Sequence, residues 1–174
     1  MNSEVLDVDM LAFERGSSNT KQAVVDGVMK SLETGFVYTS HDMSQDCLDE
    51  VYGMLGEFFS KSTPQKETAK AEGTNGQRGY TGLLVETAAI SDVPDWKEML
   101  NWGKDIPTGH PLKKRYPHRF FNNVFPEDLV PGITGTLEKF HDVVLDLQLR
   151  FLRIIALGLK ASETFFDSFV PGGA

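Results

Sequence analysis

The sequence predicts an α+β domain that is rich in helices and has only a few short strands. A long amphipathic pattern near the carboxyl end predicts one dominant helix, and an earlier helical stripe ends in a glycine followed by an aromatic, β-branched run. Five prolines between residues 107 and 131 exclude a long helix there. The chain has 174 residues, 40% of them hydrophobic, which is enough to bury the core of a single domain covering residues 1–174.

The first expected elements are a strand, a helix and a second strand. Apolar and acidic side chains alternate loosely over residues 4–11, which predicts a short N-terminal strand. Thr20 is a usable N-cap for a helix that stops at Gly35, a residue suited to the left-handed conformation of helix ends. Residues 35–40, with the sequence GFVYTS, favour a strand because aromatic and β-branched side chains suit a pleated surface.

Two further helices and a long loop are expected after that strand. Ser44 can cap a helix that ends near residues 58–64, with the sequence FFSKSTP. Residues 61–82 hold one proline and four glycines among charged and small residues, which predicts a loop long enough to bind a ligand. From about Pro131 to Gly158 apolar residues recur at spacings of three and four, the strongest helical pattern in the chain.

Composition restricts the class of protein. Seventeen Lys and Arg stand against twenty-five Asp and Glu, a formal charge of -8, so binding to nucleic acid has no global electrostatic support. The single cysteine, Cys47, excludes an internal disulfide and a Cys-rich metal site and indicates a reducing, cytoplasmic setting. An acidic N-terminus without a long apolar run favours neither a signal peptide nor a membrane span.

The adjacent residues His41 and Asp42 raise the question of a metal site. Iron sites of the two-His-one-carboxylate kind use His-x-Asp on a strand, because side chains two residues apart share a face. The side chains of direct neighbours diverge, so this pair is not expected to hold a metal ion, and neither are His141 and Asp142, which have the same spacing.

Two other segments hold candidate chemistry. Residues 110–121, HPLKKRYPHRFF, place basic side chains among aromatic ones and could contact an anion or nucleic acid, although a solvated basic loop is the favoured interpretation. Residues 95–103, DWKEMLNWG, could supply an acid–base pair in Asp95 and Glu98. An aromatic segment anchored in the core, with its acids at the surface, is the preferred alternative.

Taken in order, these segments resemble the N-terminal region of the non-haem Fe(II)/2-oxoglutarate-dependent oxygenases related to isopenicillin N synthase. The residues that carry the resemblance are Gly35, Phe36, Tyr38, His41, Phe58, Phe59, Pro64, Lys66, Gly79 and Tyr80. His41 resembles a structural histidine of this family. The chain departs from the family pattern at Phe125, where a tryptophan is usual, and at residues 40–42, where Asn-His-Gly is frequent.

The resemblance implies a helix-rich region that flanks a double-stranded β-helix (jelly-roll) core, the main part of which is not in this chain. The family's iron ligands and the Arg-x-Ser that binds 2-oxoglutarate belong to that core, so no catalytic or metal-binding residue is assigned here. We therefore expect an N-terminal fragment, a truncated product or half of a split enzyme that is inert alone. Fe(II) and 2-oxoglutarate are implied for the complete enzyme, with a small-molecule substrate and the C-terminal catalytic half as partners.

Arg78 and Tyr80 are the substrate-contact candidates that the resemblance implies, because the family's Arg/Gly/Tyr segment can line the substrate entrance. A guanidinium can bind a carboxylate through two parallel hydrogen bonds. The alternative is a loop anchored by the tyrosine, with the arginine at the surface. A stand-alone, non-catalytic interaction module and an ordinary acidic α+β domain with a fortuitous motif order also stay open as alternatives to the oxygenase.

Overall fold

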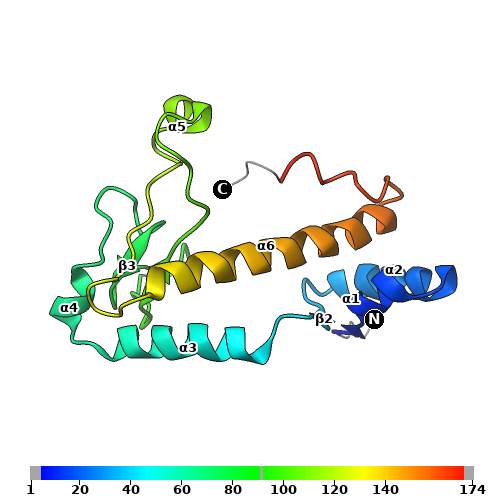
Figure 1. Ribbon diagram of the computed structural model, residues 1–174, viewed down its shortest axis with the longest axis horizontal. Coiled ribbons are helices and arrows are strands. Elements are labelled where there is room, and N and C mark those ends of the chain that lie inside the picture. Colours follow the sequence, from blue (N-terminus) through cyan, green and yellow to red (C-terminus); the bar gives the residue numbers. More distant parts are fainter. Residues whose placement is uncertain (1–4, 91, 171–174) are drawn as a thin grey trace. The chain divides into compact units, whose positions relative to one another are not determined.

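The computed structural model describes residues 5–90 and 92–170, and these residues form six helices and four very short strands (Figure 1). The elements are β1 (Asp7–Val8), α1 (Met10–Arg15), α2 (Ser18–Leu32), β2 (Tyr38–Thr39), α3 (Gln45–Ser60), α4 (Thr63–Glu67), β3 (Gly79–Thr81), β4 (Met99–Asn101), α5 (Pro111–Arg115) and α6 (Ile133–Gly158). This is the helix-rich α+β class that the sequence predicts. No helix within the described residues has the length and apolarity needed to cross a membrane.

The chain divides into two compact units. A central unit comprises residues 45–141, and a terminal unit comprises, within the described residues, 5–44 and 142–170. Helix α6 contributes its first turns to the central unit and its remaining turns to the terminal unit.

The terminal unit begins with a strand that is shorter than predicted. Only Asp7 and Val8 pair with β2, in parallel, because the carboxylate of Asp9 accepts a hydrogen bond from the Ala12 amide (3.0 Å) and starts α1. Helix α2 is confirmed, but its N-cap is Ser17 and not Thr20. The residues after α2 turn at Gly35 (φ 84°) and enter β2 as the sequence predicts.

Buried Ser31 joins these first elements. Its hydroxyl accepts a hydrogen bond from the amide of Leu6 (2.9 Å) and donates one to the carbonyl of Phe36 (2.6 Å). Around it lies an apolar core made of Val8, Met10, Phe13, Val24, Val25, Val28 and Ile154. The last of these residues comes from α6, which therefore closes the terminal core.

The central unit packs α3 and the start of α6 around a small antiparallel sheet. Strands β3 and β4 pair with Tyr80 opposite Leu100. The buried core consists of Val51, Phe58, Ala69, Tyr80, Leu100, Val130, Ile133 and Leu137. The predicted spacing of apolar residues in α3 and α6 is confirmed, since Val51 and Leu137 are almost completely buried.

Two segments predicted to be irregular contain short helices. Helix α4 lies inside the predicted loop 61–82, where Ser62 and Gln65 form a capping box and Pro64 occupies the first turn. Helix α5 begins at Pro111 in the proline-rich segment, where the Nδ1 atom of His110 accepts a hydrogen bond from the Leu112 amide (3.2 Å). Both helices are only five residues long, so caps and prolines determine them and periodicity does not.

Candidate functional site

Gly79 separates the two substrate-contact candidates in the chain. Its φ of +71° is not that of a regular strand, and a Cβ atom there would lie 2.9 Å from the Ala71 amide nitrogen. Side chains two residues apart share a face only in a regular strand. The φ of Gly79 therefore removes the regular strand geometry that would put Arg78 and Tyr80 on one face.

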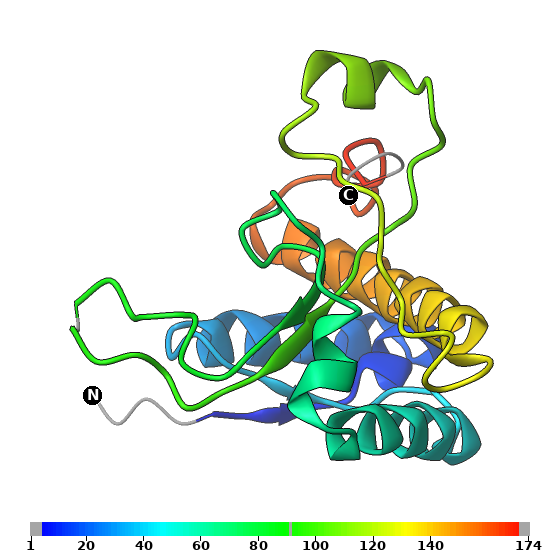
Figure 2. The same ribbon diagram turned by 90° about the vertical axis from the view of Figure 1, so that its left-hand side faces the viewer.

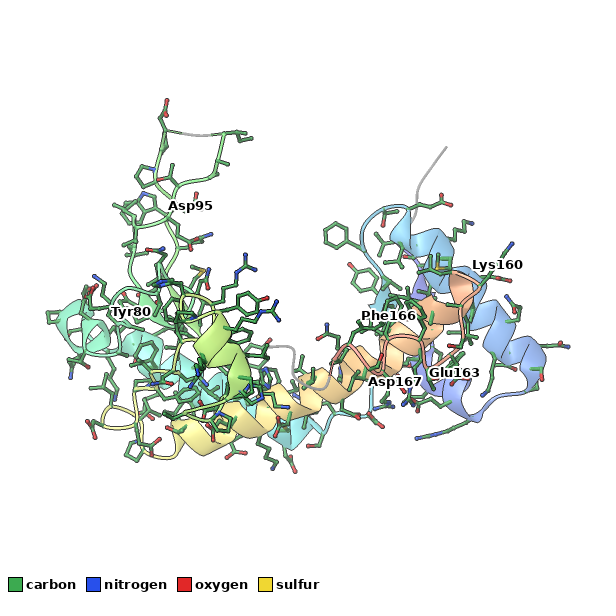
Figure 3. All side chains as sticks on the ribbon, turned by 90° about the horizontal axis from the view of Figure 1, so that it is seen from above. Tyr80, Asp95, Lys160, Glu163, Phe166 and Asp167 are labelled. Atoms are coloured by element: carbon green, nitrogen blue, oxygen red, sulfur yellow. The ribbon has the colours of Figure 1, made fainter. Side chains whose placement is uncertain are left out.

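Tyr80 points into the core of the central unit. It is 2% exposed, and its ring packs edge-on against Phe58 with centroids 5.8 Å apart. In Figure 3 it lies among the crowded side chains of this unit. Its hydroxyl donates a 2.6 Å hydrogen bond to Oε2 of Glu98. The single phenolic proton is thus committed to this carboxylate.

Lys66 completes a buried cluster with Glu98 and Tyr80. Its Nζ lies 2.6 Å from Oε2 of Glu98, donates to the Phe59 carbonyl (3.2 Å) and sits 5.7 Å from the centre of the Tyr80 ring. Burial alone would raise the pKa of Glu98, but the hydrogen bonds from Lys66 and Tyr80 outweigh it and lower this pKa. Burial and then the Glu98 hydrogen bond raise the pKa of Tyr80. The cluster joins α4, β3 and the residue before β4.

The guanidinium of Arg78 has few partners. Its Nη1 donates to the carbonyl of Gln77 (2.8 Å), while its buried Nε has no hydrogen-bond partner. No carboxylate among residues 5–90 and 92–170 forms an ion pair with it. Burial lowers the pKa of this guanidinium, because removing a charge from water disfavours the charged form. Arg78 is therefore a half-buried cation without a counter-ion in the described chain.

The Arg78 guanidinium faces a cleft of about 760 Å³. The residues that line it are Gln77, Arg78, Trp102, Gly103, His118, Arg119, Phe120 and His141. Gly103 gives the guanidinium its space, since a Cβ atom there would lie 2.7 Å from Nη2 of Arg78. The Asn123 side chain fixes Gly103 by accepting from its amide (3.0 Å) and donating to its carbonyl (2.7 Å).

A second, smaller hollow has a volume of about 380 Å³. Arg78 and Tyr80 both contribute to its wall, together with the acidic residues Glu67, Glu72 and Glu86. The two predicted residues thus both line this hollow, and the guanidinium of Arg78 also contacts the cleft at Gly103.

The other candidates lie apart from the cleft. Asp42 accepts hydrogen bonds from Arg150 (2.8 and 3.1 Å), which lower its pKa, and His41 is exposed. Asp95 lies on a loop, described for residues 82–90 and 92–96, that reaches away from the rest of the central unit (Figures 2 and 3), and it pairs with Lys97 (3.2 Å). Asp95 and Glu98 thus have different partners, and Glu98 is not the surface acid that the sequence favoured.

Arg119 and His118 were predicted only as parts of a basic segment. The structure brings both to the cleft wall beside Arg78. The interleaved basic and aromatic residues of 110–121 were the signal, but the sequence offers no means of pairing them with a residue forty positions earlier.

The fold is similar to about half of two solved structures, one of them from the 2OG-Fe(II) oxygenase family. A putative 2OG-Fe(II) oxygenase family protein from Caulobacter crescentus superposes on 95% of this chain and 52% of its own, with a TM-score of 0.78 and 24% identity. A full-length Neurospora crassa protein, solved in complex with alpha-KG, superposes on 97% of this chain and 52% of its own, with a TM-score of 0.76 and 24% identity.

Sequence comparison identifies the family. Residues 5–128 match the family described as non-haem dioxygenase in morphine synthesis N-terminal, and the chain belongs to it, as the resemblance predicted. The 2-oxoglutarate-dependent dioxygenase caaD of Aspergillus niger is 26% identical over 98% of this chain and 53% of its own length. Azadirone synthase LFS of Melia azedarach is 30% identical over 78% of this chain and 40% of its own. The chain thus spans about half the length of these curated relatives.

Iron and 2-oxoglutarate are the groups named with these relatives. Across the part of the chain that the structure describes, no three His, Cys, Asp or Glu side chains come together as a metal ion would require. The donor set of the described residues therefore does not fit an iron centre.

Proposed function

We propose that this chain is the N-terminal part of an Fe(II)/2-oxoglutarate-dependent oxygenase that hydroxylates, desaturates or cyclises a small molecule. The observation that carries the proposal is the family match over residues 5–128, supported by fold similarity to oxygenases over nearly the whole chain. Its catalytic partner is the C-terminal half of the same enzyme, which supplies the iron and co-substrate ligands.

The intact mass of the natural gene product tests this proposal first. A mass well above the 19.3 kDa of this chain, together with Fe(II)-dependent conversion of 2-oxoglutarate to succinate, is the expected result. A product of this larger mass that does not consume 2-oxoglutarate in the presence of Fe(II) would contradict the oxygenase assignment.

We further propose that this chain alone is catalytically inert and that it is cytoplasmic, as its use of a single cysteine favours. Incubation of the purified chain with Fe(II) and 2-oxoglutarate is expected to release no succinate above the protein-free control. Turnover by the isolated chain would contradict the division of labour between two halves.

Arg78 is the stronger of the two proposed substrate contacts, because its charge is unpaired while the hydroxyl proton of Tyr80 is held by Glu98. In the complete enzyme, Arg78→Ala is expected to raise KM for substrate about tenfold, the loss of one charge-assisted contact. Arg115→Ala is the matched control, since Arg115 lies over the ring of Tyr116. Equal Michaelis constants for the two variants would refute the role of Arg78.

A non-catalytic interaction module is the second candidate, and exposed apolar side chains of the 82–96 loop favour it. Ile90 is 100% and Trp96 80% exposed, and Val93 is 70% exposed. If this loop binds a partner, the isolated chain should bind a hydrophobic dye and Trp96→Ser should reduce the signal. A chain that binds no dye would argue against the module.

A further inference from the structure

We propose that the 760 Å³ cleft beside Arg78 binds a small aromatic carboxylate. This inference rests on the proposed function in one respect, that the bound acid is the substrate of the oxygenase. The binding itself is a property of this chain and is tested without iron, 2-oxoglutarate or turnover.

The charge of the cleft wall points to an anion. Two arginines and two histidines contribute to the wall, and none of its residues is acidic, in a protein whose net charge is -8. A hollow lined with one sign of charge concentrates ions of the opposite sign. The charge of the wall is thus opposite in sign to the net charge of the protein. The guanidinium of Arg78, which lacks a counter-ion in the described chain, lies in this wall.

The guanidinium of Arg78 supplies the strongest indication. Its Nε is buried with no hydrogen-bond partner, so the fold does not satisfy this cation, and its Nη2 lies beside the cleft residue Gly103. Arg119 lies on the same wall, so two planar guanidinium groups are available to one carboxylate. Gly103 leaves room for Arg78, and Asn123 holds Gly103 in place.

The remaining wall residues indicate an aromatic group on the ligand. Trp102 and Phe120 line the same cleft as the two arginines. The indole N–H of Trp102 already donates to the Leu137 carbonyl (3.2 Å), so this side chain offers its ring alone. An aromatic ligand could pack against these rings in an offset-stacked or edge-to-face arrangement. The volume of the cleft, about 760 Å³, suits a small organic molecule.

Tryptophan fluorescence of the 174-residue chain provides the test. The chain has two tryptophans, and Trp96→Phe leaves Trp102 as the only reporter. The probes are sodium benzoate, benzyl alcohol as its uncharged analogue, sodium acetate as its ringless analogue, and inorganic phosphate. We expect a saturable change with benzoate in the millimolar range and at least tenfold weaker binding of the other three.

Variants locate the binding in the Trp96→Phe background. Arg119→Ala and Arg78→Met are expected to weaken benzoate binding about tenfold each, whereas Arg115→Ala removes a charge from the same basic segment outside the cleft wall and should change little. Gly103→Ala keeps both arginines but forces Arg78 to move, so it should weaken binding as well. Far-UV circular dichroism checks that each variant is folded.

Several outcomes would overturn the proposal. Equal binding of benzyl alcohol would contradict the anion site, equal binding of acetate would contradict the aromatic requirement, and tighter binding of phosphate would replace the carboxylate with a phosphate. Equal affinities in Arg119→Ala and Arg115→Ala would place the binding elsewhere. None of these results would contradict the oxygenase proposal, which depends on 2-oxoglutarate turnover by the complete gene product.

Discussion

Arg150 in the terminal unit has carboxylate partners, whereas Arg78 in the central unit has none among the described residues. Arg150 contacts three carboxylates, those of Glu14, Asp42 (2.8 Å) and Asp146 (3.4 Å), and hydrogen bonding to the first two raises its pKa. Arg78 forms no ion pair within the described chain, and burial lowers its pKa. The fold thus supplies carboxylate partners to the guanidinium of Arg150 and, over the part of the chain that the structure describes, none to that of Arg78.

We interpret this difference as one between residues that hold the fold and a residue available to a ligand. Lys66 belongs with Arg150, because Glu98 neutralises it inside the central core. A cation with its counter-ion in place stabilises the fold through charge-assisted hydrogen bonds. A half-buried cation without one costs free energy, and this cost is the basis of our proposal that a molecule binds there. Substitution of each cation, or of its partner, shows to which of these two groups it belongs.

The largest effect is expected for Glu98→Ala, which leaves the ammonium of Lys66 buried with only the Phe59 carbonyl. We expect a loss of about 3 kcal/mol in the free energy of unfolding, the lower end for a broken buried pair because Glu98 is partly exposed. Urea unfolding followed by circular dichroism measures it. Glu72→Ala is the matched control, since its carboxylate pairs with Lys70 at 3.5 Å on the surface. Equal losses of unfolding free energy in the two variants would show that the Lys66–Glu98 pair does not stabilise the fold more than a surface pair does.

Acid should weaken the same cluster. The pKa of Glu98 in the folded chain is below its ordinary value, so its contribution to stability is complete above about pH 4.5 and disappears as the pH falls through the folded pKa. The wild-type protein should therefore lose more stability than Glu98→Ala between pH 5 and about pH 3. Parallel acid profiles would show that Glu98 has the same pKa in both states.

Arg150→Met is expected to have the next largest effect. It removes the cation from three carboxylates, and we expect a loss of about 1–3 kcal/mol, reduced by the solvent exposure of Asp42 and Asp146. Arg153→Met is the control on the same helix, because Arg153 pairs with Asp167 (2.9 Å) closer to solvent. If the Arg150 variant is as stable as the Arg153 variant, the three carboxylates do not make Arg150 a major stabilising residue of the terminal unit.

Tyr80→Phe is expected to have a smaller effect, which depends on pH. Loss of the hydroxyl hydrogen bond to Glu98 should cost about 1 kcal/mol at neutral pH. The raised pKa means that folded Tyr80 keeps its proton where an unfolded tyrosine loses it, so wild-type stability should fall as the pH rises above about 10. The variant should lack this part of the alkaline loss. Superimposable alkaline profiles would contradict the raised pKa.

The sequence predicted the long elements because α3 and α6 repeat apolar residues over several turns. It missed α1 and α4, which depend on the caps at Asp9 and Ser62, and it overextended the first strand. The pairing of Asp7 with Tyr38 joins residues that are far apart in the chain, and local propensity cannot detect such a contact.

The sequence names residues of the proposed site but not the contacts between them. Family resemblance points to Arg78 and Tyr80, and Lys66 and Glu98 belong to separate motifs. Nothing in the sequence indicated that Tyr80 binds Glu98 or that Arg119 shares a cleft with Arg78, because each contact depends on how the chain folds. The positive φ of Gly79, which interrupts regular strand geometry between Arg78 and Tyr80, is likewise a property of the folded backbone.

The central claim, that Arg78 serves a ligand and not the fold, is tested most directly by the free energy of unfolding of Arg78→Met. We predict a value within about 0.5 kcal/mol of the wild type, or slightly above it, because the substitution removes a half-buried charge that has no counter-ion. A loss of about 2 kcal/mol or more, comparable with that of Arg150→Met, would show that Arg78 is a structural residue and would contradict the claim.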